Sequence, residues 1–437
     1  MINKIFYKIK TDRFYFDSIV LIFFTVLGNL FAFLVNIIYT RTLPPGQYGA
    51  IMSINSLINI LGTVAIAFRM FNVRETSEFI LENQTYKAIS FSYKFSLYSF
   101  IAITIFFLSI FPVYSYLVFF INVDYLAILF ALAIVIFSYI TSITSSLFQS
   151  MKMFFALGIV TFIYPFVRFV FTYPYIILWN GYIGATASML TGIVLSFVIS
   201  SFIILHKEQN TINNNESPKF NLSYFLPLIP IVIINAFYSF LNFGDVIFSR
   251  KYFNEADTDI FAIASTIAKA NLFVIAPISY VVLPRMIEDL HKKGYISSVK
   301  ALFKGVFLAL ISSFFYTVFI YVFSDTILGI FGERYLNAKP ILLLFTIAFI
   351  PIATSLLLIN YGIVFKNWFF MLPLFISDLI LILGFTFFHK TFEEMILVDL
   401  ISGTFLFLTL VIMIFLSKEP KSKVSEEENT LPDYKSL

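Results

Sequence analysis

Four charged side chains interrupt long apolar stretches of this sequence and are its clearest candidates for chemistry: Lys269, Arg168, Asp245 and Asp378. A charge in the middle of a membrane span costs at least about 2.5 kcal/mol unless it faces water or a partner. We therefore expect Lys269 and Arg168 to line a polar cavity for an anionic ligand. The two carboxylates are candidates for binding H⁺ or Na⁺, and their alternative role is as counter-ions for the two basic residues.

The two basic residues lie in different settings. Lys269 is about ten residues into an apolar span, roughly 15 Å deep at 1.5 Å per residue. Its alternatives are an ion pair between helices, with Asp378 as the partner considered, and snorkelling to the interface. Arg168 lies between Pro165 and Pro174, and a guanidinium can bind a phosphate through two parallel hydrogen bonds. Snorkelling to the outer interface is the alternative for Arg168.

Two apolar stretches carry polar side chains at helical spacing, which places them on one face. Such a face inside a membrane must contact water or polar groups of another helix, so we expect Asn36, Asn235 and Asn242 to line the cavity. Arg41 and Arg250 follow the outer ends of the two stretches; they either receive an anionic head group or anchor the helix ends at the interface. The stripes comprise Thr25, Asn29, Ala32, Asn36 and Thr40, and then Asn235, Ser239, Asn242 and Ser249, with Asp245 on the flank.

The composition is that of a polytopic membrane protein. Of 437 residues, 59% are hydrophobic and only 12% are charged, against about 25% charged in a soluble domain. There is no cysteine, which excludes disulfides and thiolate metal sites. The three histidines are far apart in sequence, so no metal site is expected. The sequence has no Gly-x-x-x-x-Gly-Lys-Ser/Thr motif, so ATP hydrolysis is not expected, and nothing indicates an enzyme, a cofactor or a nucleic-acid partner.

Apolar segments long enough to cross a membrane predict an all-α protein with about twelve transmembrane helices. We divide the chain into a cytoplasmic N-terminal segment (1–16), a six-helix bundle (17–205), a polar linker (206–223), a second six-helix bundle (224–416) and a cytoplasmic disordered tail (417–437). A polar loop is expected at 69–90 and the third span at 95–119. Most of the 29 Lys and Arg residues fall on the side of the two termini, which predicts that both termini are cytoplasmic. A third acid, Asp399, lies near the outer end of its span.

The two halves resemble each other. A shift of 209 residues places Arg41 on Arg250 and Asn36 on Asp245. Six spans per half give both halves the same orientation, so this is the parallel type of repeat.

Four motifs together resemble the polysaccharide biosynthesis membrane proteins, the O-antigen and capsule repeat-unit flippases of the multidrug/oligosaccharidyl-lipid/polysaccharide exporter superfamily. They are Arg41-Thr-Leu-Pro-Pro-Gly-Gln-Tyr-Gly-Ala50, Gly244-Asp245 through Tyr252 to Phe261-Ala262, Val282-Leu-Pro-Arg285, and Ile330-Phe-Gly-Glu-Arg-Tyr-Leu-Asn-Ala338. The sequence departs from the family at Asp257-Thr-Asp-Ile260, where a Gly-Tyr-like step is more usual.

The resemblance implies two six-helix bundles in a V, as in multidrug and toxic-compound (MATE) exporters. It implies a bacterial inner-membrane protein that flips undecaprenyl-pyrophosphate-linked oligosaccharide to the outer leaflet, for O-antigen, lipopolysaccharide or capsule. Membrane lipid, a polysaccharide polymerase and a chain-length regulator are the candidate partners. Two rival interpretations stay open: a cation-coupled multidrug exporter of the same fold, which should carry an acid inside spans one to six, and a membrane polysaccharide polymerase, which should carry a large loop.

Overall fold

The structure is a computed structural model that describes residues 13–109, 111–179, 181–208, 228–365 and 367–417. Within these ranges all regular structure is helical, and twelve helical segments are long and apolar enough to cross a membrane. The expected all-α fold with about twelve spans is thus confirmed. Most of the predicted segment 1–16, linker 206–223 and tail 417–437 lies outside the described residues.

The first six spans form the N-terminal bundle, in which two spans are interrupted. The second span consists of two helices that meet at Thr63, and the third is followed by a short helix. Its helices are α2 (Arg13–Thr42), α3 (Gln47–Gly62), α4 (Val64–Leu81), α5 (Thr85–Ser109), α6 (Phe111–Ile121), α7 (Tyr125–Ser150), α8 (Phe154–Leu178) and α9 (Tyr182–Glu208).

The C-terminal bundle repeats this pattern, and its second span is also interrupted, at Ala270. Its elements are α10 (Ile229–Tyr252), α11 (Glu255–Lys269), α12 (Asn271–Lys293), α13 (Tyr295–Phe331), α14 (Lys339–Val364), α15 (Met371–Phe387) and α16 (Phe392–Leu416), with the 3₁₀ helices η2 (Glu333–Ala338) and η3 (Trp368–Phe370).

The expected polar loop at 69–90 is wrong, because α4 continues to Leu81 and α5 already begins at Thr85. The polar side chains that suggested a loop are paired between helices. The Asn72 amide donates to the hydroxyls of Ser92 at 2.9 Å and Ser146 at 2.7 Å. Polar residues satisfied in this way do not end a helix.

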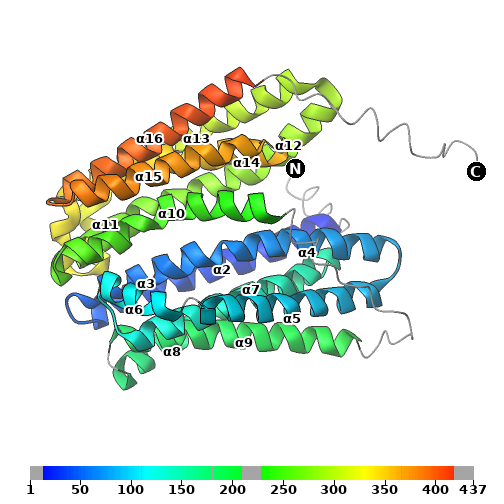
Figure 1. Ribbon diagram of the computed structural model, residues 1–437, viewed down its shortest axis with the longest axis horizontal. Helices are drawn as coiled ribbons and strands as arrows, with labels where there is room; N and C mark the ends of the chain where they lie inside the picture. Colours follow the sequence, from blue (N-terminus) through cyan, green and yellow to red (C-terminus); the bar gives the residue numbers. More distant parts are fainter. Residues whose placement is uncertain (1–12, 110, 180, 209–227, 366, 418–437) are drawn as a thin grey trace, which may run out of the picture.

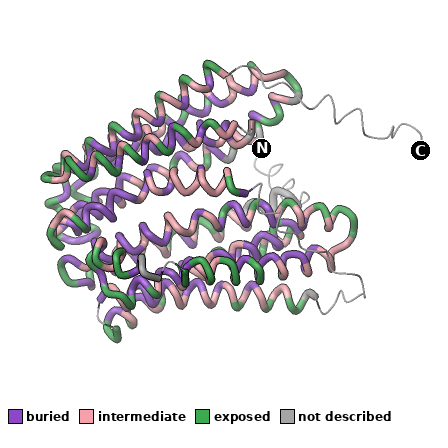
Figure 2. Tube along the Cα trace, in the orientation of Figure 1, coloured by how far each residue is buried: buried purple, intermediate pink, exposed green. Residues whose placement is uncertain are grey.

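The two bundles form a V (Figure 1). Their ribbons meet at the end that holds α6, α11 and the α2–α3 connection, and they diverge toward the other end. Cross-bundle packing joins α3 to α10 and α11, and α2 to α13. Buried residues gather inside each bundle and at the end where the bundles meet (Figure 2). The expected orientation assigns this closed end to the outer face of the membrane.

Candidate functional site: charged groups between and within the bundles

Lys269 lies in an ion pair inside the C-terminal bundle. Its ammonium is 2.5 Å from Asp245 Oδ1, and the two side chains are 11% and 2% exposed. The Ser265 hydroxyl donates to Asp245 Oδ2 at 2.7 Å. An inter-helix ion pair was one expected alternative for Lys269, but the partner considered, Asp378, is wrong. Lys269 is thus held by α10 and is not free in a cavity in this conformation.

The break in the eighth span positions this lysine. Lys269 is the last residue of α11, where a positive charge is favoured by the helix dipole. The interruption leaves backbone groups without helical partners. The Tyr316 hydroxyl donates to the Ile267 carbonyl at 2.5 Å, and buried Asn271 donates to the Ser313 hydroxyl at 3.0 Å. These bonds to α13 stabilise the break and hence the position of the ammonium.

A second carboxyl group lies beside the pair. Asp399 on α16 is 3% exposed and interacts electrostatically with both Asp245 and Lys269. Neither of its side-chain oxygens has a hydrogen-bond partner among the described residues. With both acids ionised, this cluster of two carboxylates and one ammonium would carry one uncompensated negative charge in a buried site. Such a charge is costly, so the cluster can accept one further positive charge, a proton or a metal cation.

Asp378 lies apart from this cluster. It is 5% exposed on α15, and its Oδ1 has no hydrogen-bond partner in the part of the chain that the structure describes.

Arg168 is buried in the N-terminal bundle and contacts a tyrosine. Its Nε and Nη2 atoms donate to the Tyr39 hydroxyl at 3.2 and 3.1 Å, and it is 8% exposed. No carboxylate of the described residues forms an ion pair with it. The interior of this bundle therefore contains a cation whose contacts are neutral groups, and an anion is the ligand that would complete it.

The three asparagines expected to line the cavity bond within their own helices. The side-chain amide of Asn36 donates to the Ala32 carbonyl at 3.1 Å, Asn235 to Ile231 at 2.7 Å, and Asn242 to Tyr238 at 2.5 Å. Each bond runs to the residue four positions earlier, a common local alternative for such side chains. Backbone carbonyls of the same helix therefore supply part of the hydrogen bonding that these polar side chains need inside a membrane.

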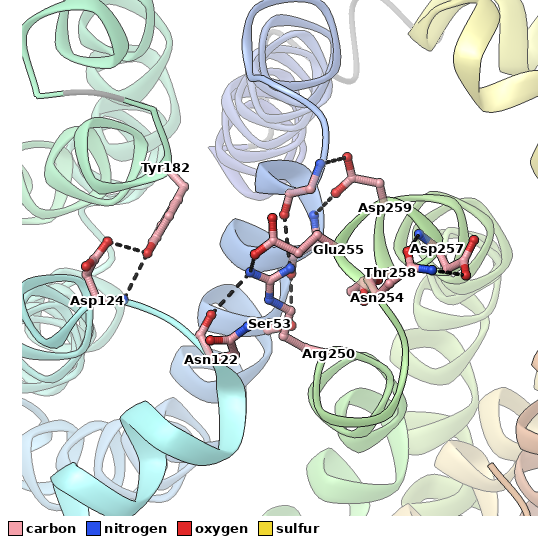
Figure 3. A network of polar contacts seen from close by, with 12 residues as sticks. Ser53, Asn122, Asp124, Tyr182, Arg250, Asn254, Glu255, Asp257, Thr258 and Asp259 are labelled. Atoms are coloured by element: carbon pink, nitrogen blue, oxygen red, sulfur yellow. Dashed lines mark hydrogen bonds and ion pairs between the residues drawn. The ribbon is translucent and has the colours of Figure 1, made fainter. Parts of the chain in front are cut away.

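The closed end of the V is held by polar contacts between the bundles (Figure 3). Asp259 on α11 is buried, and its carboxylate accepts hydrogen bonds from the backbone N–H groups of Gly46 at 2.7 Å and Gly49 at 2.6 Å. Gly46 is the N-cap residue of α3 and Gly49 lies in its first turn, so neither N–H group has a helical acceptor. An acid of one bundle thus caps a helix N-terminus of the other, the arrangement that the helix dipole favours.

Glycines make this approach possible. Gly46 has φ +87°, a left-handed conformation that glycine adopts without strain. A Cβ atom on Gly49 would lie 2.5 Å from Thr258 Cγ2, so a side chain there would push α3 away from α11.

Three arginines bind backbone carbonyls across the same interface. Arg41 Nη2 donates to Gly329 at 2.8 Å and Ile330 at 2.9 Å. Arg250, whose guanidinium also pairs with Glu255, donates to the carbonyls of Gly46 and Asn122, both at 3.2 Å. Arg334 Nη2 donates to Thr40 at 2.9 Å and Leu43 at 3.1 Å. We call Asp259, Arg41, Arg250 and Arg334 the outer latch.

The latch gives Arg41 and Arg250 a role that the sequence did not predict. In this conformation both bind helix-end carbonyls, so neither has its guanidinium free for a head group. Sequence reasoning missed Asp259, Arg334 and Tyr39. It named Asp399 but did not predict that this acid interacts with Asp245 and Lys269. The signal for Asp259 was its departure from the family pattern; no comparable signal marked Tyr39.

Similarity to solved structures identifies the fold. No protein-family model and no curated protein matches the chain. Solved structures do match: an inward-facing multidrug resistance MATE family transporter of the MOP superfamily has a TM-score of 0.65 at 14% identity over 91% of this chain and 96% of that one. The lipid II flippase MurJ in an inward closed conformation has a TM-score of 0.68 at 17% identity over 92% and 87%. A MOP superfamily transporter from Pyrococcus furiosus has a TM-score of 0.62 at 12% identity over 91% and 95%. The chain therefore has the MATE-like fold of MOP-superfamily transporters.

Proposed function

We propose that the protein is a flippase that moves undecaprenyl-pyrophosphate-linked oligosaccharide from the inner to the outer leaflet, for surface polysaccharide synthesis. The observation that carries the proposal is the buried Arg168, whose guanidinium contacts the hydroxyl of Tyr39 and no acid of the described residues. A bundle with an interior cation of this kind favours anionic cargo such as a pyrophosphate. The shared fold with a lipid II flippase supports the same substrate class.

The outer latch supports alternating access as the mechanism. Rocking of two rigid bundles about a central site is the common mode for transporters built from repeats. The contacts of the outer latch lie at one end of the V, between segments at the ends of long helices. Opening this end breaks hydrogen bonds to backbone groups that water can replace, so the two states can be close in free energy.

Coupling would reside in the cluster of Asp245, Lys269 and Asp399. A proton or sodium ion arriving there would compete with the ammonium for the carboxylates. Lys269 lies at the break between α11 and α12, so its release would act on the helix that also carries Asp259. The charge state of the cluster would then bias the latch through α11.

Deletion of the gene tests the function. Lipid-linked oligosaccharide should accumulate in the inner leaflet. Accumulation in the outer leaflet would instead assign the protein as a polymerase.

Substitution of the arginine tests the cationic site. Arg168→Gln should reduce surface polysaccharide at unchanged membrane abundance, and Arg168→Lys should retain part of it. The matched control is Arg74→Gln, because Arg74 is exposed and pairs with Glu78 on its own helix. Equal amounts of surface polysaccharide in cells that carry Arg168→Gln and in cells that carry Arg74→Gln would refute the role of the buried cation.

A cation-coupled multidrug exporter is the second candidate, favoured by the MATE matches. Against it, the buried acids Asp245, Asp378 and Asp399 lie in the C-terminal bundle and not in the first six spans, where such an exporter should carry one. If it is correct, the deletion strain becomes sensitive to cationic dyes and its polysaccharide stays normal.

A further inference from the structure

A groove of about 630 Å³ runs between the inner ends of α13 and α16. Its walls are apolar and include Ile296, Phe303, Phe307 and Phe415, and two lysines, Lys300 and Lys304, stand along one side. The rings of Phe303 and Phe415 stack at 4.9 Å between centroids and join the two helices. The groove thus combines a hydrocarbon-like surface with a concentrated positive charge.

The groove lies at the boundary of the membrane. After Lys304, the segment Gly305–Ser324 carries no charge, which matches the roughly 20 residues that a helix needs to cross the hydrocarbon core. Lys304 therefore marks the inner edge of the hydrocarbon, and Lys300 lies about one turn further into the head-group region. Phe307 lies on the hydrocarbon side of the same face.

Within the described residues, neither lysine is neutralised by an acid. Their four-residue spacing puts both on one face of α13, and among the described residues no acid pairs with either ammonium. The lysines of the neighbouring helix α12 differ, because Lys292 pairs with Glu288 and Lys293 with Asp289, each at 2.9 Å. Charge complementarity therefore calls for an anionic group at Lys300 and Lys304.

The inner end of the groove is fixed by hydroxyl groups. The Tyr295 hydroxyl lies 2.6 Å from Ser417 Oγ and 2.8 Å from the Tyr361 hydroxyl. These bonds tie the start of α13 to the end of α16. The groove is therefore held open by a fixed contact at its inner end and by the aromatic stack at its wall.

We propose that this groove binds one anionic glycerophospholipid of the cytoplasmic leaflet. Its phosphate lies between Lys300 and Lys304, and an acyl chain follows Phe303, Phe307 and Phe415 toward the membrane centre. Basic pockets between transmembrane helices on this side are a recognised way of binding such head groups. Because α16 lies on the side of its bundle away from the N-terminal bundle (Figure 1), this lipid is a resident ligand and not the cargo.

Native mass spectrometry of the purified, delipidated protein tests the proposal, with phosphatidylglycerol and phosphatidylcholine as probes. Wild-type protein should bind one phosphatidylglycerol more tightly than phosphatidylcholine. The double variant Lys300→Gln/Lys304→Gln should bind phosphatidylglycerol about 30-fold more weakly, since each lysine near an anionic lipid contributes about 1 kcal/mol and 1.4 kcal/mol is tenfold. Its phosphatidylcholine binding should not change.

The control is Lys292→Gln/Lys293→Gln, which removes the same charge from paired lysines and should leave the affinity unchanged. An equal affinity of wild type for the two lipids would overturn the proposal. So would an equal loss of phosphatidylglycerol binding in the two double variants, because that result would indicate a diffuse surface charge. Tight binding that appears only after removal of residues 418–437 would assign the groove to that segment instead.

Discussion

Asp259→Asn should shift the protein toward an outward-open conformation. In the closed conformation the carboxylate accepts from two backbone N–H groups, of Gly46 and Gly49. An asparagine side chain has a single acceptor oxygen, so one of the two N–H groups loses its partner. In an outward-open state both N–H groups would face water, and the substitution would cost little there.

The expected shift follows from this difference. A hydrogen bond to a charged group contributes about 1.5–3 kcal/mol, and a buried N–H without a partner costs about 1–3 kcal/mol. We therefore expect the closed state to lose about 2 kcal/mol relative to the open state, which is about a 30-fold change in their ratio.

Distances between spin labels across the outer face measure this ratio. The sequence contains no cysteine, so Leu178→Cys on the N-terminal bundle and Lys390→Cys on the C-terminal bundle can be labelled without other changes. Both positions are exposed. Asp259→Asn should move population from the short to the long distance.

The matched control is Asp257→Asn. Asp257 lies on the same helix and bonds only Asn254 of its own bundle in the described contacts. The distance distribution of the control should equal that of wild type. If Asp259→Asn also leaves the distribution unchanged, the latch does not hold the bundles together and the reasoning fails.

Two further outcomes concern stability, measured by thermal unfolding of the purified protein. Lys269→Met should destabilise the fold by about 3–5 kcal/mol, because it leaves the buried carboxylate of Asp245 without its partner. The double variant Lys269→Met/Asp245→Asn should regain much of this lost stability. A double variant as unstable as the single variant would contradict the pairing. Gly184→Ala should cost about 1–3 kcal/mol, because a Cβ there would lie 1.9 Å from the Tyr175 carbonyl oxygen. The control is Gly329→Ala, because nothing lies within 4 Å of the added Cβ atom. This substitution should stabilise the helix by up to about 1 kcal/mol. Equal changes in stability for Gly184→Ala and Gly329→Ala would show that close packing at Gly184 is unimportant.

The sequence predicts the membrane spans well because length and apolarity alone determine them. Twelve spans follow from runs of about 20 apolar residues, and the described part of the chain has twelve helical segments long and apolar enough to cross a membrane. The limits of helices outside the hydrocarbon are harder to predict. At Asn72, polar side chains pair between helices, so a polar stretch is helical where a loop was expected.

The sequence also identifies the charged groups that matter but not how they pair. Lys269 and Asp245 are separated by 24 residues, and their contact depends on how α11 packs against α10. No periodicity within one helix reveals such a pair. The same limit applies to Asp259 and Gly46, which are 213 residues apart.

The departure from the family pattern at Asp257-Thr-Asp-Ile260 has a structural consequence. This step supplies Asp259, the acid of the latch, and Thr258, which packs against Gly49. The segment that weakened the resemblance locally thus supplies one of the contacts that join the two bundles.

Transport in proteoliposomes tests the proposed function most directly. The reconstituted protein would be loaded with undecaprenyl-pyrophosphate oligosaccharide in one leaflet, and its arrival in the other would be read with a membrane-impermeant glycosidase. The account predicts protein-dependent transfer that Arg168→Gln reduces and Arg74→Gln does not. Transfer no faster than in empty vesicles, together with uptake of a cationic dye, would contradict it.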